Sequence, residues 1–238
     1  MALRHSPKIV TDGLLRCLDI GNNKSYPGSG STITDLSKTK DNGTNNGASY
    51  NSDDPKNFSF GNDDYISGTS FYNSRDAGSV EVWFQHNQSS HSQSGMLYFE
   101  GNHNGFGDQK EMHLSVGTDG KLNIFFEDAA GNDLNVSQSD SIPTNTWTCA
   151  TVTYTGLTSA KSTKIYVNGS LNTSGSISGT YFGGSPSEAS YIGRSATLAG
   201  SVYRGLVGKI AIVRCYNKQL SDAEVLQNYN AMKGRFGL

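Results

Sequence analysis

The sequence predicts an all-β fold, a sandwich of two antiparallel sheets that closes on one short C-terminal helix. Short apolar runs recur along the 238 residues, and clusters of Gly, Asn, Asp and Ser separate them. The 28 glycines suit a chain with many tight turns. No helical pattern alternates with the strands, which argues against a parallel βαβ architecture. A chain of this length can bury a full core without disulfides or metal ions.

The expected strands follow from the apolar runs and from the turn residues between them. They cover 13–20, 57–60, 64–68, 78–85, 95–101, 146–154, 188–195 and 209–216, with hairpins over 112–128 and 164–172. Asp119-Gly120 and Asn168-Gly169 each suit the type I′ turn of a two-residue hairpin. The polar segment 21–49 is expected to be one long loop of the same domain.

Two of the strands indicate which faces must be covered. The strand 78–85 has three apolar residues on one face, Val80, Val82 and Phe84. The last strand, 209–216, carries apolar residues on both faces, and such a strand needs cover on both sides. We expect the opposing sheet to cover one face, and the helix to cover the other face or one end of the sandwich.

The helix itself is expected over 221–233. Ser221 and Glu224 have the S-x-x-E spacing of a capping box, which marks a helix N-terminus. Gly234 is expected to end the helix. Its apolar residues recur at helical spacing: Val225, Leu226, Tyr229 and Met232.

Charge and cysteine content narrow the possible partners. The formal net charge is −2 and the pI is about 6.2, so nucleic acid is not an expected partner. No run approaches the roughly 18 apolar residues of a membrane helix, so no membrane partner is expected. Cys17, Cys149 and Cys215 lie among strand-like residues and are expected to be buried and reduced. The first residues lack the apolar core of a signal peptide, and free thiols suit folding in a cytoplasm.

The sequence carries no strong enzymatic motif, so no enzyme is expected. There is no HExxH, P-loop or GxSxG pattern. A glycosidase needs two carboxylates across the scissile bond, and Glu81 has Trp83, not a second carboxylate, two residues on. His103 and His113 flank a Gly-rich loop and are expected to be solvated. The five histidines show no metal-ligand spacing; they are His5, His86, His91, His103 and His113.

Acidic and aromatic loop residues are the candidate ligand sites. Oxygen-rich loops can hold calcium, and the candidates are Asp63, Asp64, Glu127, Asp128 and Asp133. Acidic residues beside glycine also form plain turns, and we favour that interpretation, so no cofactor or metal is expected. The candidates for contact with a carbohydrate or a partner lie in Gly-rich loops: His103, Phe106, Tyr181 and Phe182.

The ordered motifs resemble a known family. "FSFGNDDYISG", "GSVEVWFQ", "TWTCATVTYTG", "IYVNGSL", "YIGRS" and "GKIAIVRCYNKQLSDAEVLQNYN" resemble the laminin-G/pentraxin-like branch of the concanavalin A-like lectin superfamily, over roughly residues 13 to 233. The resemblance implies a jelly-roll sandwich. The calcium-site pattern of pentraxins and legume lectins is not matched. The resemblance also implies that seven residues are fold determinants: Trp83, Trp147, Asn168, Gly169, Tyr216, Leu220 and Ser221.

A narrower resemblance concerns the two ends of the chain. "KIVTDGLLRCLDIGNNKSYPGSGSTITDLS" and "NAMKGRFGL" are similar to laminin-G-like domains in virion proteins of tailed bacteriophages. This similarity implies a non-enzymatic structural protein of the virion surface, a capsid decoration or head fibre, folded in the host bacterial cytoplasm. An arm, 1–12, and the loops 21–49 and 101–111 would dock one domain, 13–238, onto capsid proteins or sister copies in a homo-oligomer. The alternative is a lectin-like module that binds host surface polysaccharide.

Overall fold

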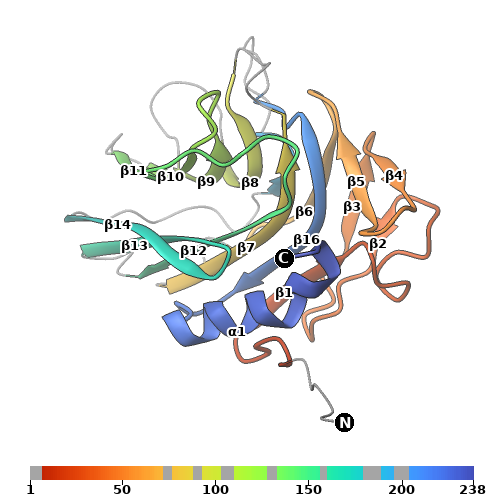
Figure 1. The fold of residues 1–238 in the computed structure, drawn as a ribbon, viewed down its shortest axis with the longest axis horizontal. Coiled ribbons are helices and arrows are strands. Elements are labelled where there is room, and N and C mark those ends of the chain that lie inside the picture. Colours follow the sequence, from red (N-terminus) through yellow and green to blue (C-terminus); the bar gives the residue numbers. More distant parts are fainter. Residues whose placement is uncertain are drawn as a thin grey trace.

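The fold is a sandwich of two antiparallel sheets. The computed structural model describes residues 7–71, 77–87, 93–102, 110–127, 133–155, 160–178, 189–195 and 204–238. Within these ranges each sheet has eight strands, and Figure 1 shows the two sheets stacked as layers. The predicted fold class, all-β with one short C-terminal helix, is confirmed. No helix within the described ranges is both long and apolar enough to cross a membrane.

Both sheets bring together strands that are far apart in the sequence. Sheet A runs in the order β14 (Ser170–Ser178), β13 (Ala160–Val167), β12 (Thr148–Thr155), β7 (Ala77–His86), β16 (Gly208–Tyr216), β5 (Asn57–Phe60) and β4 (Ser49–Asn51), with β1 (Leu14–Asp19) beside β16. Sheet B runs in the order β11 (Asp133–Ser137), β10 (Leu122–Glu127), β9 (Lys110–Val116), β8 (Gly95–Asn102), β15 (Ala189–Ile192), β6 (Tyr65–Thr69), β3 (Gly43–Asn46) and β2 (Thr32–Ile33). The first and last strands therefore pair with each other.

The core lies between the sheets and is built from alternate residues of each strand. Val80, Val82 and Phe84 of β7 are fully buried there, as the period of two predicts. Leu114 of β9 and Ile124 of β10 meet them from sheet B. The opposite side chains of β9 and β10 consequently face outward.

A β-bulge in β16 changes which side chains face the core. The pairing with β7 shifts register between Ile210 and Ile212. Ile210 and Val213 therefore both pack between the sheets, whereas Ala211 and Ile212 pack on the outer face of sheet A. Both faces of the strand are covered, but simple alternation does not give the correct face for each residue.

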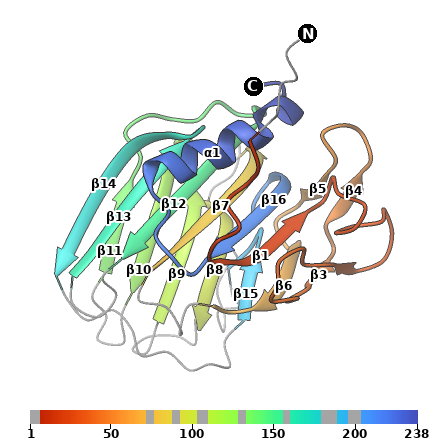
Figure 2. The same ribbon diagram turned by 90° about the horizontal axis from the view of Figure 1, so that it is seen from below.

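The helix α1 (Asp222–Met232) supplies the cover for the outer face of sheet A (Figure 2). Ser221 Oγ accepts the Glu224 N–H at 3.3 Å and a Glu224 oxygen accepts the Ser221 N–H at 2.9 Å, which completes the capping box. The α-helix ends at Met232, close to the expected end at Gly234, and Gly234 itself lies in a 3₁₀ turn, Lys233–Phe236, that follows the helix. This turn carries Phe236 onto Trp83, with ring centroids 4.3 Å apart.

A buried polar network joins α1 to sheet A. Asn228 donates from Nδ2 to Glu81 Oε2 and to Tyr216 Oη, both at 2.9 Å, and its Oδ1 accepts the Val10 N–H at 2.8 Å. Arg214 donates to the other oxygen of Glu81. Burial lowers the pKa of Arg214, but the adjacent Glu81 carboxylate holds that pKa above its usual value. The network satisfies the Asn228 amide and both oxygens of Glu81, and it packs part of the predicted N-terminal arm against the helix.

Two hairpin turns differ in the way they close. Asn168 and Gly169 have φ of 50° and 79°, as a type I′ turn requires. In the other hairpin Gly120 has φ of 76°, but Asp119 has no positive φ. The Gly120 N–H donates to the Gly117 carbonyl at 2.9 Å, so this loop is a wider turn. The type I′ prediction for Asp119-Gly120 is therefore wrong.

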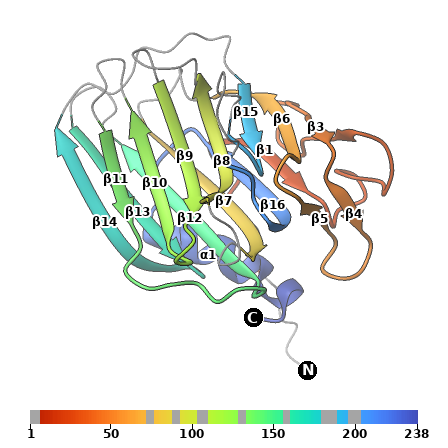
Figure 3. The same ribbon diagram turned by 90° about the horizontal axis from the view of Figure 1, so that it is seen from above.

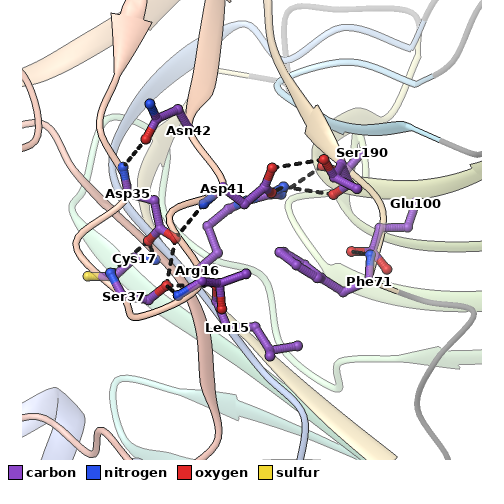
Figure 4. Close-up of polar contacts among 12 residues, drawn as sticks. Leu15, Arg16, Cys17, Asp35, Ser37, Asp41, Asn42, Phe71, Glu100 and Ser190 are labelled. Atoms are coloured by element: carbon purple, nitrogen blue, oxygen red, sulfur yellow. Dashed lines mark hydrogen bonds and ion pairs between the residues drawn. The ribbon is translucent and has the colours of Figure 1, made fainter.

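The segment 21–49 is more ordered than a loop. It contains β2 and β3, and Ile33 is fully buried in the core. Its buried carboxylate, Asp35, accepts backbone N–H groups of Cys17 and Ser37 at 2.8 Å (Figure 4). The expectation of one long loop is wrong because a buried polar residue organises strands that are too short to show a hydrophobic period.

Arg16 ties this segment to both sheets. Its side chain extends from β1 toward sheet B, where it donates to Ser190 Oγ and to the Thr69 carbonyl, each at 2.7 Å (Figure 4). It also pairs with Asp41, and its guanidinium carbon lies 4.5 Å from the centre of the Phe71 ring. This cluster fixes β6 and β15 beside the strands that form the site described next.

Candidate functional site

The candidate site is a groove of about 610 Å³ on the outer face of sheet B. It lies over β8, β9, β10 and β11, the strands that face the viewer in Figure 3. The helix covers the opposite side of the sandwich, on sheet A. The groove is therefore an open concave surface on the side of the molecule away from α1.

Alternation along the strands explains why these side chains line it. In β10, Leu122, Ile124 and Phe126 are fully buried in the core. The residues between them are half-buried and line the groove; they are Asn123, Phe125 and Glu127. The flanking strands β9 and β11 alternate in the same way.

A row of aromatic rings crosses the groove. The register places Phe125 opposite His113, and His113 opposite Phe99. The His113 and Phe125 rings are stacked with centroids 4.8 Å apart, and the Phe99 and His113 rings are stacked at 6.4 Å. His113 therefore covers one face of the Phe125 ring. The other side of that ring points toward β11, where Asn135 is its register partner.

The aromatic row continues beyond the groove. Tyr191 of β15 lies 6.2 Å from Phe99, and Tyr65 of β6 lies 5.7 Å from Tyr191, measured between ring centroids. Arg194 ends the row, with its guanidinium carbon 3.8 Å from the centre of the Tyr65 ring. These cross-strand contacts join five strands and make the floor of the groove rigid.

Amide and hydroxyl groups lie beside the Phe125 ring. Asn123 donates from Nδ2 to Asn135 Oδ1 at 2.5 Å and to Ser137 Oγ at 2.9 Å. These bonds orient both amides. Within the part of the chain that the structure describes, no hydrogen bond is made by Asn123 Oδ1 or by Asn135 Nδ2. One acceptor and one two-proton donor thus remain for a ligand.

Charge is distributed unevenly along the groove. Glu111 and Glu127 face each other in register at one end of the strands. Glu111 is 5% exposed, and its Oε1 lies 3.3 Å from His113 Nδ1. Lys121 and Arg204 line the opposite end, beside the turn between β9 and β10. The groove is therefore acidic at one end and basic at the other.

Two of the acidic residues considered for calcium, Asp63 and Asp64, lie in a turn of the described chain. Asp64 Oδ2 accepts the Gly61 N–H at 2.7 Å, as a turn-forming residue does. Asp63 contributes its backbone carbonyl, which lies 3.5 Å from Arg194 Nη1. Asp133 begins β11 in register with Glu127, and Asp128 lies outside the described residues. No group of three acidic, His or Cys side chains in the described part of the chain is placed to hold a metal ion.

The four loop residues expected to contact a carbohydrate lie outside the described residues: His103, Phe106, Tyr181 and Phe182. His113 was expected to be solvated, but it lies within β9 and is 5% exposed, because its ring is stacked between Phe99 and Phe125. Sequence reasoning missed Phe125 and Asn135. The available signal was the polar alternation shared by three successive segments, "EMHLSV", "LNIFFE" and "DLNVS".

The residues expected to be fold determinants lie on the other side of the sandwich. Trp83 is fully buried under α1, and its ring is stacked on Tyr229 at 5.7 Å between centroids. Trp147 packs on Phe236 at 5.0 Å. Asn168 accepts the Cys149 N–H at 2.9 Å. Leu220 is buried with Tyr216 in the cluster at the start of the helix.

A family model for the laminin-G type of the concanavalin A-like lectin/glucanases superfamily matches residues 60–226. The chain belongs to this superfamily. The resemblance seen in the ordered motifs is thereby confirmed at superfamily level. No curated protein matches the chain.

Solved structures with the fold of this laminin-G-like domain include receptor-binding domains of botulinum neurotoxins. The binding domain of neurotoxin DC in complex with SialylT has a TM-score of 0.68 and 14% identity, over 94% of this chain and 52% of that chain. The same binding domain in complex with rat synaptotagmin II has a TM-score of 0.67 and 14% identity, with the same coverage. The type G receptor-binding domain has a TM-score of 0.65 and 16% identity, over 92% and 51%. The chain thus spans about half the length of these domains.

Proposed function

We propose that this laminin-G-like domain is a non-enzymatic binding module whose ligand is a glycan held in the groove of sheet B. The observation that carries the proposal is the pairing of Phe125 with the two oriented amides of Asn123 and Asn135. A pyranose ring presents an apolar face to an aromatic ring and hydroxyl groups at its edges. An aromatic surface with a few fixed polar groups is the usual arrangement of a small-molecule site.

Two solved structures of the same fold support this class of function. The binding domain of neurotoxin DC was solved once with SialylT and once with rat synaptotagmin II. These structures support a binding role, toward a sugar or a protein, and the chain covers 52% of that binding domain. We favour a sugar here because the groove combines aromatic and amide groups, and its volume of about 610 Å³ lies in the range of small-molecule sites.

The arrangement of carboxylates favours binding over hydrolysis. A glycosidase needs two carboxyl groups that reach the bond from opposite sides. Among the described carboxylates that line the groove, Glu111 is almost wholly buried against His113, and Glu127 and Asp119 lie at opposite ends of the strands. Incubation with the bound glycan should therefore release no reducing ends.

The virion role remains a second proposal, and it rests on the similarity of both chain ends to tailed-phage proteins. Lys8 and Val10 of the predicted arm bond to Gln227 and Asn228 of the helix, so these residues are already engaged within the domain. Capsid docking would then use other surfaces, such as 21–49. Cryo-electron microscopy of intact particles tests this role, because density over the head lattice supports it and density absent from the particle refutes it.

A glycan array tests the binding proposal directly. The wild-type chain should bind at least one class of surface oligosaccharide, and Phe125→Ala should abolish that binding because the ring face is lost. Leu171→Ala is the matched control, because Leu171 is 49% exposed on β14 of sheet A. Equal binding by wild type and Phe125→Ala, or no binding across the array, would overturn the proposal.

A further inference from the structure

We infer that the glycan is acidic and that its carboxylate binds at the basic end of the groove, between Arg204 and Lys121. This inference rests on the proposed function, since it names the class of ligand for the same groove. It adds a charged contact to the contact between the pyranose and the Phe125 ring, and it fixes the direction in which the ligand lies along the groove.

The backbone places both basic residues at the same end of the sheet. The Met96 N–H, at the start of β8, donates to the Arg204 carbonyl at 3.3 Å. The Gly117 N–H, just after β9, donates to the Lys121 carbonyl at 2.8 Å. Met96 is the register partner of Ser115 in β9, so Arg204 and Lys121 lie at the same end of the sheet, with the ends of β8 and β9 between them.

Neither basic side chain has a carboxylate partner within the described part of the chain. Arg204 is exposed, and it donates a hydrogen bond from its backbone N–H to Ser195 Oγ at 3.4 Å. Lys121 donates to Asp119 Oδ1 at 3.1 Å through its backbone N–H. Other basic residues of the chain are paired with carboxylates, namely Arg16, Lys164, Arg214, Lys218 and Arg235.

The charge balance of the groove sets the orientation of the ligand. Among the described residues that line the basic end, Arg204 and Lys121 outnumber the single carboxylate of Asp119. Glu111 and Glu127 face each other at the opposite end, away from both basic residues. An acidic oligosaccharide would therefore place its carboxylate beside Arg204 and Lys121, with a neutral pyranose over Phe125.

The experiment compares each acidic glycan with its carboxyl-reduced form. Sialylated and uronic-acid oligosaccharides are titrated against the full chain, beside the same oligosaccharides with the carboxylate reduced to an alcohol. Two exposed ion pairs predict about three- to tenfold tighter binding of the acidic form at low salt. The preference should shrink as sodium chloride is raised to about 0.5 M, because salt screens exposed charges.

Charge-neutral variants show whether these two residues cause the preference. Arg204→Gln and Lys121→Gln should each lower the ratio of the affinity for the acidic glycan to the affinity for its reduced form. Lys24→Gln is the matched control, because Lys24 is an exposed lysine outside the groove lining. An unchanged preference in both groove variants would overturn the inference.

The outcomes separate this inference from the proposed function. Equal affinity for acidic and reduced forms, with both lost in Phe125→Ala, overturns the acidic ligand but leaves a glycan groove in place. Absence of binding to every form overturns the proposed function itself. Preference for the acidic form that disappears in Arg204→Gln supports both.

Discussion

The polar network under α1 predicts that removing the Asn228 side chain lowers the free energy of unfolding by a large amount. Asn228→Ala removes three hydrogen bonds of 2.8–2.9 Å and leaves the Val10 N–H without an acceptor. It also removes one donor to the buried Glu81 carboxylate. Each buried group left unsatisfied costs about 1–3 kcal/mol, so we expect a loss of about 3–5 kcal/mol in the free energy of unfolding. That is a large share of the ~5–15 kcal/mol of a typical domain.

Urea unfolding followed by tryptophan fluorescence measures this loss. Trp83 and Trp147 both lie against Phe236, so their emission should report detachment of the C-terminal segment. At an m-value of about 2–3 kcal/mol per M, the midpoint should fall by roughly 1–2 M.

Two further variants make the test specific. Leu226→Ala is the control on the same helix; Leu226 is 46% exposed, and its loss should cost within about 0.5 kcal/mol. Asn228→Asp keeps an acceptor for the Val10 N–H but faces Glu81 with a second carboxylate, so it should destabilise at least as much as Ala. A loss below about 1 kcal/mol in Asn228→Ala would refute the reasoning, because it would mean that the buried groups find other partners.

Three other predictions concern stability. Ser221→Ala should cost about 1 kcal/mol by removing the helix cap, measured by thermal unfolding. Gly169→Ala should lower the free energy of unfolding more than Gly30→Ala does. Both glycines have positive φ, but a Cβ at Gly169 would lie 2.9 Å from Tyr229 Cβ, whereas a Cβ at Gly30 would meet nothing within 4 Å. Equal losses in the two variants would exclude that clash. Burial lowers the pKa of His86, whose Nε2 lies 3.0 Å from the Ile142 carbonyl, so the unfolded chain binds a proton more readily than the folded chain. The free energy of unfolding should therefore fall as the pH drops below about 6.5. A flat pH profile, or a slope that persists in His86→Gln, would contradict this.

The general architecture could be predicted from the sequence because it depends on local, repeated signals. Alternation in 78–85 places Val80, Val82 and Phe84 in the core, and the spacing of Ser221 and Glu224 marks the start of α1. These signals extend over only a few residues, so they can be recognised in the sequence without knowledge of the tertiary fold.

The remaining features depend on contacts between distant segments. The strands β2 and β3 are too short to show a period, and they are held by Asp35 and Arg16 through bonds to other parts of the chain. The bulge at Ala211 reverses the faces of β16, and no residue type marks it.

The candidate site was missed for the same reason. Phe125, His113 and Asn135 come from three strands, and only their register brings them together. The facing carboxylates of Glu111 and Glu127 likewise lie on neighbouring strands, whereas a search along one strand finds no such pair. Candidate residues chosen from aromatic loops instead lie outside the described residues, so those assignments stay predictions.

The measurement that tests the central claim most directly is a crystal structure of the chain with the oligosaccharide that binds best on the array. We predict a pyranose against the Phe125 ring, with hydroxyl groups bonded to Asn123 Oδ1 and Asn135 Nδ2. A glycan bound at any other surface, with the groove of sheet B empty, would contradict the account.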